Sequence, residues 1–252
     1  MCTHPRPLAV QPPLACYFWS GDAIRSRSVS GVVLAGRVDV PAPPARLVAD
    51  WDRETRLRLD LEPGDVEALP LARTQARWPD YRHCVQRVAD WTRALGLRDV
   101  LATADVALMA CRGARYHHDG AHYGGMAFCN LFLGEDQGLD LHFAGTGQRI
   151  PLARGTAVVF DTAQPHGVID RRSGGFDRAD FPATRDCTQV FLTWELPVEH
   201  AGVAQALGIA FDIDASTALR LHEEQVWLDG VRASVCPACG EWQIENAAPT
   251  RS

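Results

Sequence analysis

The feature that most constrains the fold is a series of short apolar segments, separated by glycine-containing turns, between residues 104 and 194. Leu139 to Phe143 alternates between apolar and polar residues, which is the period-two pattern of a half-buried strand. Closely spaced short strands with glycine turns are typical of sandwiches and barrels. The other predicted strands are Ala104 to Ala110, Ala127 to Leu133, Arg149 to Leu152, Thr156 to Phe160, Gly167 to Asp170 and Cys187 to Trp194.

We therefore predict a mainly β protein with flanking helices. Its core, residues 100–196, is expected to be a double-stranded β-helix, a cupin-like jelly roll of two facing sheets. Residues 1–99 are expected to add N-terminal strands and a supporting helix, and residues 197–252 a C-terminal helical extension with a Cys-x-x-Cys tail. The three segments are expected to form one compact unit.

Local patterns assign the flanking segments. Apolar residues recur every three or four positions from Asp80 to Leu97, which predicts an amphipathic helix that Gly96 ends. Alternation from Arg56 to Leu61 predicts an exposed edge strand, and Val32 to Val40 another strand. The remaining segments are expected to be a loosely structured lead-in at 1–30, a loop long enough to act as a lid at 171–186, two helical pieces at 198–228 and a tail at 229–252 that ends in disorder-prone residues.

Composition narrows the function classes. The chain has 252 residues, 46% of them hydrophobic, so it can bury a sizeable core. Its net charge of -6 gives no overall field that would favour nucleic acid or an anionic membrane surface. All 25 basic residues are arginine, which excludes a lysine Schiff base or a lysine general base. No apolar run is long enough to span a membrane, and eight cysteines without a disulfide-framework spacing indicate reduced thiols and a cytoplasmic location.

Three residues have the character of metal ligands. His117 and Asp119 are two positions apart, so on a strand their side chains project from the same face. His166 follows the predicted strand that ends at Phe160. Two imidazoles and one carboxylate on one face leave coordination positions open, which suits an Fe(II) ion that must bind a co-substrate and O2. Zinc uses similar donors, so the ligand types alone leave the metal open.

With these residues, the stretch from about 100 to 196 resembles the Fe(II)/2-oxoglutarate-dependent dioxygenases, particularly their prolyl-hydroxylase-like branch. The family's pattern is His-x-Asp, a glycine before an apolar strand ending in Phe, a distal His, and a basic residue opening a strand that ends in an aromatic residue. This chain offers His117-x-Asp119, Gly155 to Phe160, His166, and Arg185 to Trp194 in that order. The resemblance implies Fe(II) held by His117, Asp119 and His166, with 2-oxoglutarate as co-substrate.

The resemblance also implies a basic residue that pairs with the far carboxylate of 2-oxoglutarate. The chain has no lysine, so an arginine must serve, and a guanidinium can bind a carboxylate bidentately. Arg185, at the head of the last predicted strand, is the preferred candidate, although its distance from His166 exceeds the family's usual interval. Arg178 fits that interval better but lies in a polar Gly/Asp-rich loop.

Four further residues near the motif have two interpretations each. Asn130 lies among apolar strand residues and either binds the co-substrate's carboxylate or is a structural amide with its own partners. His122 and Tyr123 either line the substrate side or lie in an exposed loop. His142 is expected to be solvated or to support a ligand rather than to bind metal.

The second motif, Cys236-x-x-Cys239, could be half of a zinc knuckle, a redox pair or a plain turn. One such pair supplies half of a structural zinc site, so zinc at Cys236 and Cys239 would need ligands from elsewhere.

Asp119 bears on the reaction type. Halogenases that resemble this fold lack the acidic ligand, so its presence favours hydroxylation of an unactivated C–H bond. The expected partners are O2, 2-oxoglutarate and an amino acid, a peptide or a small natural product, with no nucleic acid and no membrane. The alternatives are a cupin-like metal-binding barrel that acts as a zinc hydrolase or a sensor, and an interaction protein whose Cys-x-x-Cys tail binds a partner.

Overall fold

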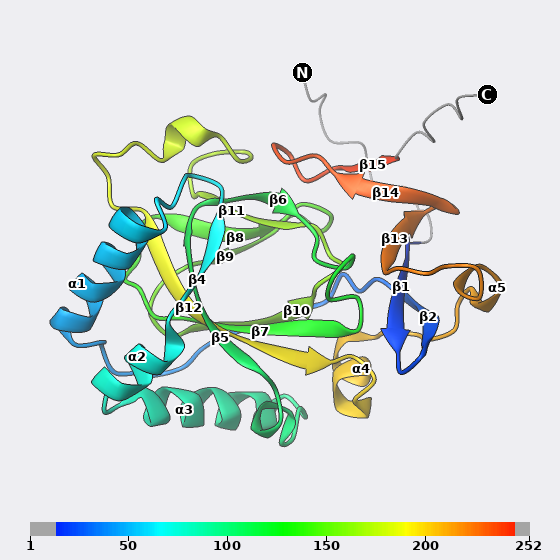
Figure 1. Ribbon diagram of the computed structural model, residues 1–252, viewed down its shortest axis with the longest axis horizontal. Coiled ribbons are helices and arrows are strands. Elements are labelled where there is room, and N and C mark those ends of the chain that lie inside the picture. Colours follow the sequence, from blue (N-terminus) through cyan, green and yellow to red (C-terminus); the bar gives the residue numbers. More distant parts are fainter. Residues whose placement is uncertain (1–13, 245–252) are drawn as a thin grey trace.

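The computed structural model describes residues 14–244, which form antiparallel sheets with few helices (Figure 1). A larger sheet has the strand order β3-β10-β7-β12-β5-β4, and a smaller sheet has the order β6-β11-β8-β9. The strands of the larger sheet are β3 (Val33–Arg37), β4 (Val66–Leu69), β5 (Val106–Arg112), β7 (Met126–Phe132), β10 (Thr156–Asp161) and β12 (Thr188–Pro197). Those of the smaller sheet are β6 (Ala114–His117), β8 (Leu139–Phe143), β9 (Gln148–Pro151) and β11 (His166–Asp170).

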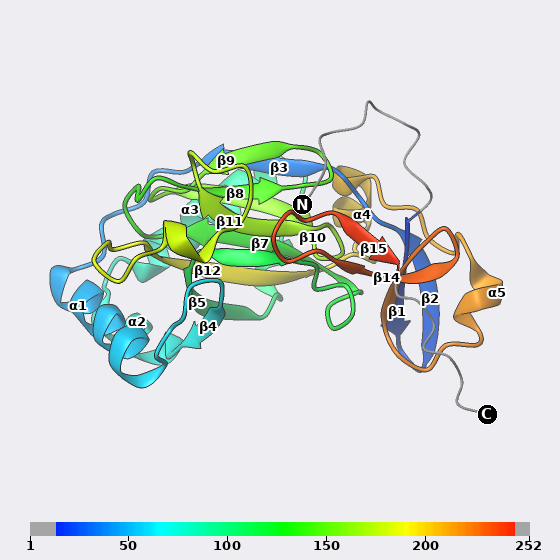
Figure 2. The ribbon, with the colours of Figure 1, turned by 90° about the horizontal axis from the view of Figure 1, so that it is seen from above.

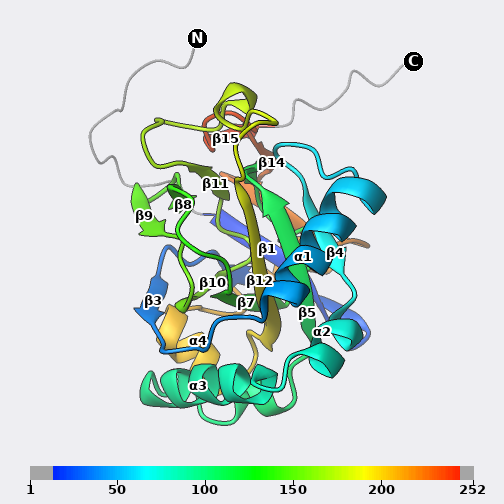
Figure 3. The ribbon, with the colours of Figure 1, turned by 90° about the vertical axis from the view of Figure 1, so that its left-hand side faces the viewer.

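From β5 to β12 the chain passes back and forth between these two sheets, which face each other (Figure 3). The predicted mainly β, antiparallel architecture is confirmed. All seven predicted core strands correspond to strands of the structure, with ends that differ by a few residues. The one core strand not predicted from the sequence is β6, because its alternation of apolar and polar residues spans only four positions.

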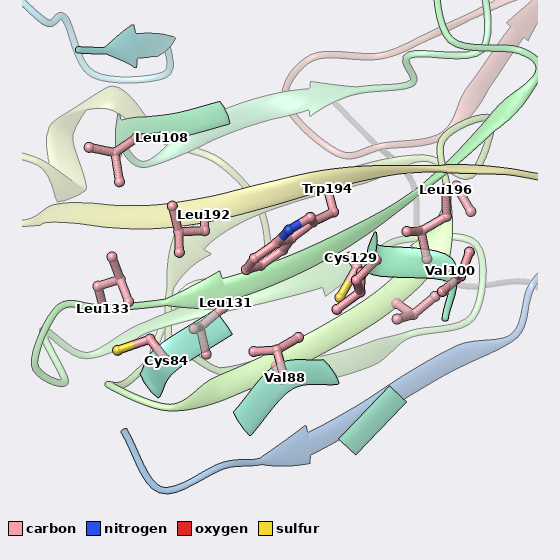
Figure 4. Close-up of a cluster of buried hydrophobic side chains, with 14 of the residues drawn as sticks. Cys84, Val88, Val100, Leu108, Cys129, Leu131, Leu133, Leu192, Trp194 and Leu196 are labelled. Carbon is pink, nitrogen blue, oxygen red and sulfur yellow. The ribbon is translucent and has the colours of Figure 1, made fainter. Parts of the chain in front are cut away.

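The larger sheet is buried on both faces because its alternate residues are apolar on both sides. Leu131 and Trp194 point toward helix α3 (Tyr81–Ala94), where they pack with Val88 (Figure 4). Phe132 and Phe191 point the other way, into the space between the two sheets. The amphipathic pattern that predicted this helix from Asp80 to Leu97 is therefore the pattern of a helix that covers a sheet.

A third sheet joins the two ends of the described chain at one end of the molecule (Figure 2). Its order is β15-β14-β13-β1-β2, so strands from the beginning of the chain pair with strands near its end. The strands are β1 (Leu14–Ser20), β2 (Ala23–Ser28), β13 (Gln225–Leu228), β14 (Val231–Val235) and β15 (Trp242–Ile244).

This sheet corrects three predictions. The lead-in is not loosely structured at residues 14–28, because Tyr17 and Phe18 are buried in paired strands. Residues 198–228 do form two helical pieces, α4 (Ala201–Leu207) and α5 (Ala215–Ala218), but they end in strand β13. The tail forms a hairpin of β14 and β15. Residues 1–13 and 245–252, the rest of the lead-in and tail, lie outside the described residues.

The predicted edge strand from Arg56 to Leu61 is wrong. This segment continues helix α1 (Ala45–Arg53) as a π-helical turn, η1 (Glu54–Arg58), before helix α2 (Leu71–Arg77). Its alternating arginines are exposed, and Arg58 pairs with Glu54 one turn earlier. Short 3-10 turns occur at Val100–Ala102 (η2) and Arg178–Asp180 (η3), and no helix between residues 14 and 244 is long and apolar enough to cross a membrane.

The strands of the predicted N-terminal segment are incorporated into the core. β3 pairs with β10 and β4 pairs with β5, so they form the two edges of the larger sheet.

Candidate metal centre

Strand pairing brings two of the three predicted ligands together. His117 is the last residue of β6 and His166 is the first residue of β11, and the two are direct partners in the antiparallel pairing of these strands. Their ring centroids are 4.4 Å apart. Asp119 follows two positions after His117, and one ligand atom from each of the three residues lies within 4.8 Å of the others. This group could hold a metal ion.

Hydrogen bonds to the backbone orient both imidazoles. Nδ1 of His117 lies 2.7 Å from the carbonyl oxygen of Arg115, and Nδ1 of His166 lies 2.9 Å from that of Gln164. A carbonyl can only accept, so Nδ1 carries the proton in each ring and Nε2 keeps its lone pair. Both Nε2 atoms face Asp119, at 3.8 Å and 3.6 Å from its Oδ2. Such outer hydrogen bonds are typical of metal-binding histidines.

The backbone also fixes the carboxylate. The N–H of Asp119 donates to the carbonyl of Thr162 at 2.8 Å, and the carbonyl of Asp119 accepts from the N–H groups of His122 and Tyr123. The hydroxyl of Thr162 donates to the carbonyl of Tyr123 at 2.7 Å. The turn after β6 is therefore tied to the turn between β10 and β11, which leads to His166.

The electrostatics favour the ligand form of His166. Burial, with a further contribution from the neighbouring His117, lowers the pKa of His166 to about 3, so its imidazole is neutral at pH 7. Burial raises the pKa of Asp119, while the nearby histidines oppose this shift. A bound cation would offset the cost of burying the carboxylate charge.

A cavity of about 250 Å³ lies beside the three ligands, between the two sheets. Its wall is mostly apolar, with phenylalanines from the larger sheet and aliphatic side chains from the smaller one. Burial raises the pKa of the Cys111 thiol to about 12, so this wall residue is neutral. Among the described residues, the other polar side chains of the lining are Tyr123, Asn130, Thr193 and Glu195.

Asn130 and Thr193 form a polar pair in this wall. They are direct partners across β7 and β12, and Oδ1 of Asn130 and Oγ1 of Thr193 are buried without a hydrogen-bond partner among residues 14–244. Buried polar atoms are rarely left without partners in folded proteins. Asn130 was predicted either to bind a ligand or to be a structural amide with its own partners. Its Oδ1 has no such partner among the described residues and is therefore available to a molecule in the cavity.

Neither predicted arginine lines the cavity. Arg185 donates to Asp170 at 2.6 Å and to the carbonyl of Gln137 at 2.5 Å. Arg178 is exposed and pairs with Glu62. The predicted pairing of Arg185 or Arg178 with the far carboxylate of 2-oxoglutarate is thus not formed in this arrangement. The guanidinium of each arginine is engaged by a carboxylate of the chain instead.

The other predicted residues lie in different places. Tyr123 lines the cavity and packs edge-on against Phe128, whereas His122 lines a separate surface cleft. His142 hydrogen-bonds the hydroxyl of Tyr116 and does not line the metal cavity.

The Cys-x-x-Cys turn packs beside the centre without joining it. Tyr116, which precedes His117, donates its N–H to the carbonyl of Pro237, between Cys236 and Cys239. Within residues 14–244 the His117, Asp119 and His166 group is the only one that brings three such ligands together, so zinc at Cys236 and Cys239 stays a prediction.

Sequence reasoning missed Thr193 and Glu195. Both occupy the same face of β12 as Phe191. The sequence could have indicated them, because they are polar residues at alternate positions of a largely apolar strand. Burial, and to a smaller extent Asp105, raises the pKa of Glu195.

No protein-family model and no curated protein matches the chain. Among solved structures, the chain is similar to a viral collagen prolyl hydroxylase from Paramecium bursaria Chlorella virus-1, with a TM-score of 0.39 and 10% sequence identity. The match covers 71% of this chain and 97% of that one. A similarity of this size carries no argument about the chemistry of the site.

Proposed function

We propose that the protein is a mononuclear non-haem Fe(II) oxygenase built on a double-stranded β-helix. Its reaction would be hydroxylation of an unactivated C–H bond in an amino acid, a peptide or a small natural product. O2 would be the oxidant, and oxidative decarboxylation of a 2-oxo acid co-substrate would supply the two electrons that reduce the second oxygen atom. The observation that carries the proposal is the convergence of His117, Asp119 and His166 at the wall of a mostly apolar cavity, with both Nε2 lone pairs aimed at the carboxylate.

The strand order supports the fold part of the proposal. A double-stranded β-helix is a jelly roll in which the chain contributes strands alternately to two facing sheets. Strands β5 to β12 follow this pattern apart from β8 and β9, which are consecutive and both lie in the smaller sheet. The histidine ligands come from the end of β6 and the start of β11, in the same sheet.

The donor set fits a ferrous ion. Two imidazoles and one carboxylate on one side leave positions open on the other, the arrangement that suits Fe(II) oxygenases. Iron, when bound, would supply the redox chemistry that activates O2.

The residues of the chain have two roles in this proposal. His117, Asp119 and His166 hold the metal, and the apolar wall excludes water from the reacting groups. The aromatic ring of Phe160 packs against the imidazole of His166, with centroids 4.8 Å apart, which holds that ligand in place.

The predicted co-substrate, 2-oxoglutarate, does not fit the described cavity in the way the family holds it. Its far carboxylate needs a cation, and among the described residues no arginine lines the cavity. We therefore propose no step that depends on 2-oxoglutarate.

The proposal is tested by anaerobic titration of the purified chain with Fe(II), followed by calorimetry. We expect one equivalent of iron to bind, His166→Ala to abolish this binding, and His83→Ala, on the exposed surface of α3, to leave it unchanged. Oxygen uptake is then screened with amino acids, peptides and small natural products, each in the presence of a 2-oxo acid as the two-electron co-substrate. Absence of iron binding, or hydrolysis supported by Zn(II) instead of oxygen uptake, would refute the proposal.

A further inference from the structure

We propose that the cavity selects a metal-chelating acid whose tail carries no charge, such as a 2-oxo acid with a branched aliphatic tail, and discriminates against 2-oxoglutarate. This inference rests on the proposed metal centre, because the metal would hold the acid's carboxylate and keto oxygens. It concerns the other end of the ligand, which lies against side chains of this chain.

The side chains that line the cavity offer no positive charge to a second carboxylate. Among residues 14–244, the cavity lining contains no arginine, and its two histidines are the metal ligands. Besides Arg185, two arginines of neighbouring strands are engaged elsewhere: Arg112 donates to the carbonyl of Phe181 at 2.7 Å, and Arg149 to that of Ser173 at 2.6 Å. A second carboxylate inside the cavity would be desolvated without a partner, which is strongly unfavourable.

The wall of the cavity is apolar where aromatic rings face inward. The rings of Phe132 and Phe191 lie 5.1 Å apart and form an apolar surface of the cavity. Two positions before Phe191, on the same face of β12, lies Gln189, which is fully buried and donates to the carbonyl of Glu135 at 3.0 Å. The alternate side chains on this face of β12 therefore begin with two uncharged residues, Gln189 and Phe191.

Toward the C-terminal end of β12, the same face becomes acidic. Thr193 is followed on this face by Glu195, whose carboxyl group also lines the cavity. The unpartnered Oδ1 of Asn130 and Oγ1 of Thr193 can meet a hydroxyl or another dipole but cannot neutralise an anion. A ligand tail that is apolar, or that carries one neutral hydrogen-bonding group, matches these surroundings.

Size does not decide between the two ligands. 4-Methyl-2-oxopentanoate and 2-oxoglutarate have similar lengths and nearly the same number of non-hydrogen atoms, and the cavity of about 250 Å³ can take either. The pair therefore isolates the effect of the tail's charge.

The test uses the full chain loaded with Mn(II), which binds such ligands without turnover. Uptake of Mn(II) alone is measured first; its failure would refute the metal centre and, with it, this inference. Calorimetric titration with each acid then compares affinities at equal ionic strength. We expect 4-methyl-2-oxopentanoate to bind at least about tenfold more tightly than 2-oxoglutarate. Equal or tighter binding of 2-oxoglutarate, or binding of neither acid to the Mn(II)-loaded chain, would overturn the inference and leave the metal centre standing.

A matched pair of variants provides a second measurement. Met109 lines the cavity opposite Phe191 across β5 and β12, and lysine has a side chain of similar length. Met109→Lys should improve binding of 2-oxoglutarate by about tenfold relative to Met109→Gln, because only the lysine adds a positive charge. Thermal melts show whether both variants fold, and if either does not, the wild-type comparison alone decides.

Discussion

The turn that leads to His166 depends on a buried ion pair, and its removal gives the sharpest stability prediction. Arg27 on β2 and Asp161 at the end of β10 are both fully buried, with N–O distances of 2.7 Å and 2.8 Å in a bidentate pair. Asp161 also accepts from the N–H groups of Ser30 and Ala163. Replacing Arg27 with methionine removes the cation and leaves this carboxylate buried.

The structure sets the size of the effect. Breaking one partner of a buried pair destabilises a protein by about 3–5 kcal/mol. Arg25, on the same strand, is 34% exposed and pairs at the surface with Glu199 and Asp212. Surface pairs contribute about 1 kcal/mol or less, so Arg25→Met is the matched control. The two variants should differ by about 3 kcal/mol in their free energies of unfolding.

Urea denaturation at pH 7 measures this difference, which corresponds to a midpoint shift of about 1 M for an m-value near 3 kcal/mol/M. The double variant Arg27→Met with Asp161→Leu should recover much of the loss, because no buried charge is then left unpaired. Equal destabilisation by Arg25→Met and Arg27→Met would show that the reasoning about burial is wrong.

Three further predictions concern other parts of the chain. Hydrogen bonds from its two arginine neighbours hold the pKa of Asp170 below its usual value of 3.8, so its stabilising contribution is present above that pH and is lost as pH falls toward the lower folded-state pKa. Asp170→Asn should therefore cost about 2 kcal/mol at pH 7, and urea denaturation should show this difference shrinking as the pH falls below 4. Gly155→Ala should destabilise by about 2 kcal/mol or more, because Gly155 has φ +83° and an added Cβ would lie 2.1 Å from a carbonyl oxygen; Gly174→Ala, which meets nothing within 4 Å, should change thermal stability by less than about 0.5 kcal/mol. Metal analysis should find one equivalent per chain that is retained when Cys236 and Cys239 are both replaced by serine, and its loss in that variant would contradict the centre at His117, Asp119 and His166; the zinc predicted for the two cysteines would be a second equivalent that this variant loses.

The local patterns of the sequence were enough for every core strand except β6 and for helix α3, because burial on one or both faces imposes the period of a strand or helix on the residues themselves. The same patterns failed from residue 56 to 61, where alternation reflected exposed arginines on a π-helical turn. They also missed β1 and β2, since β1 is stabilised by pairing with β13, about two hundred residues away in the chain, and β2 by pairing with β1.

The sequence by itself determined the candidate metal ligands, because His-x-Asp and a later histidine are recognisable as donor types and their order along the chain is explicit. Only the tertiary structure decided what surrounds them. Arg185 and Arg178 are equally cationic in the sequence, and their separation from the cavity follows from the carboxylates of Asp170 and Glu62 that fold next to them. The charge of a cavity wall depends on which side chains of distant strands face inward, and strand pairing settles that.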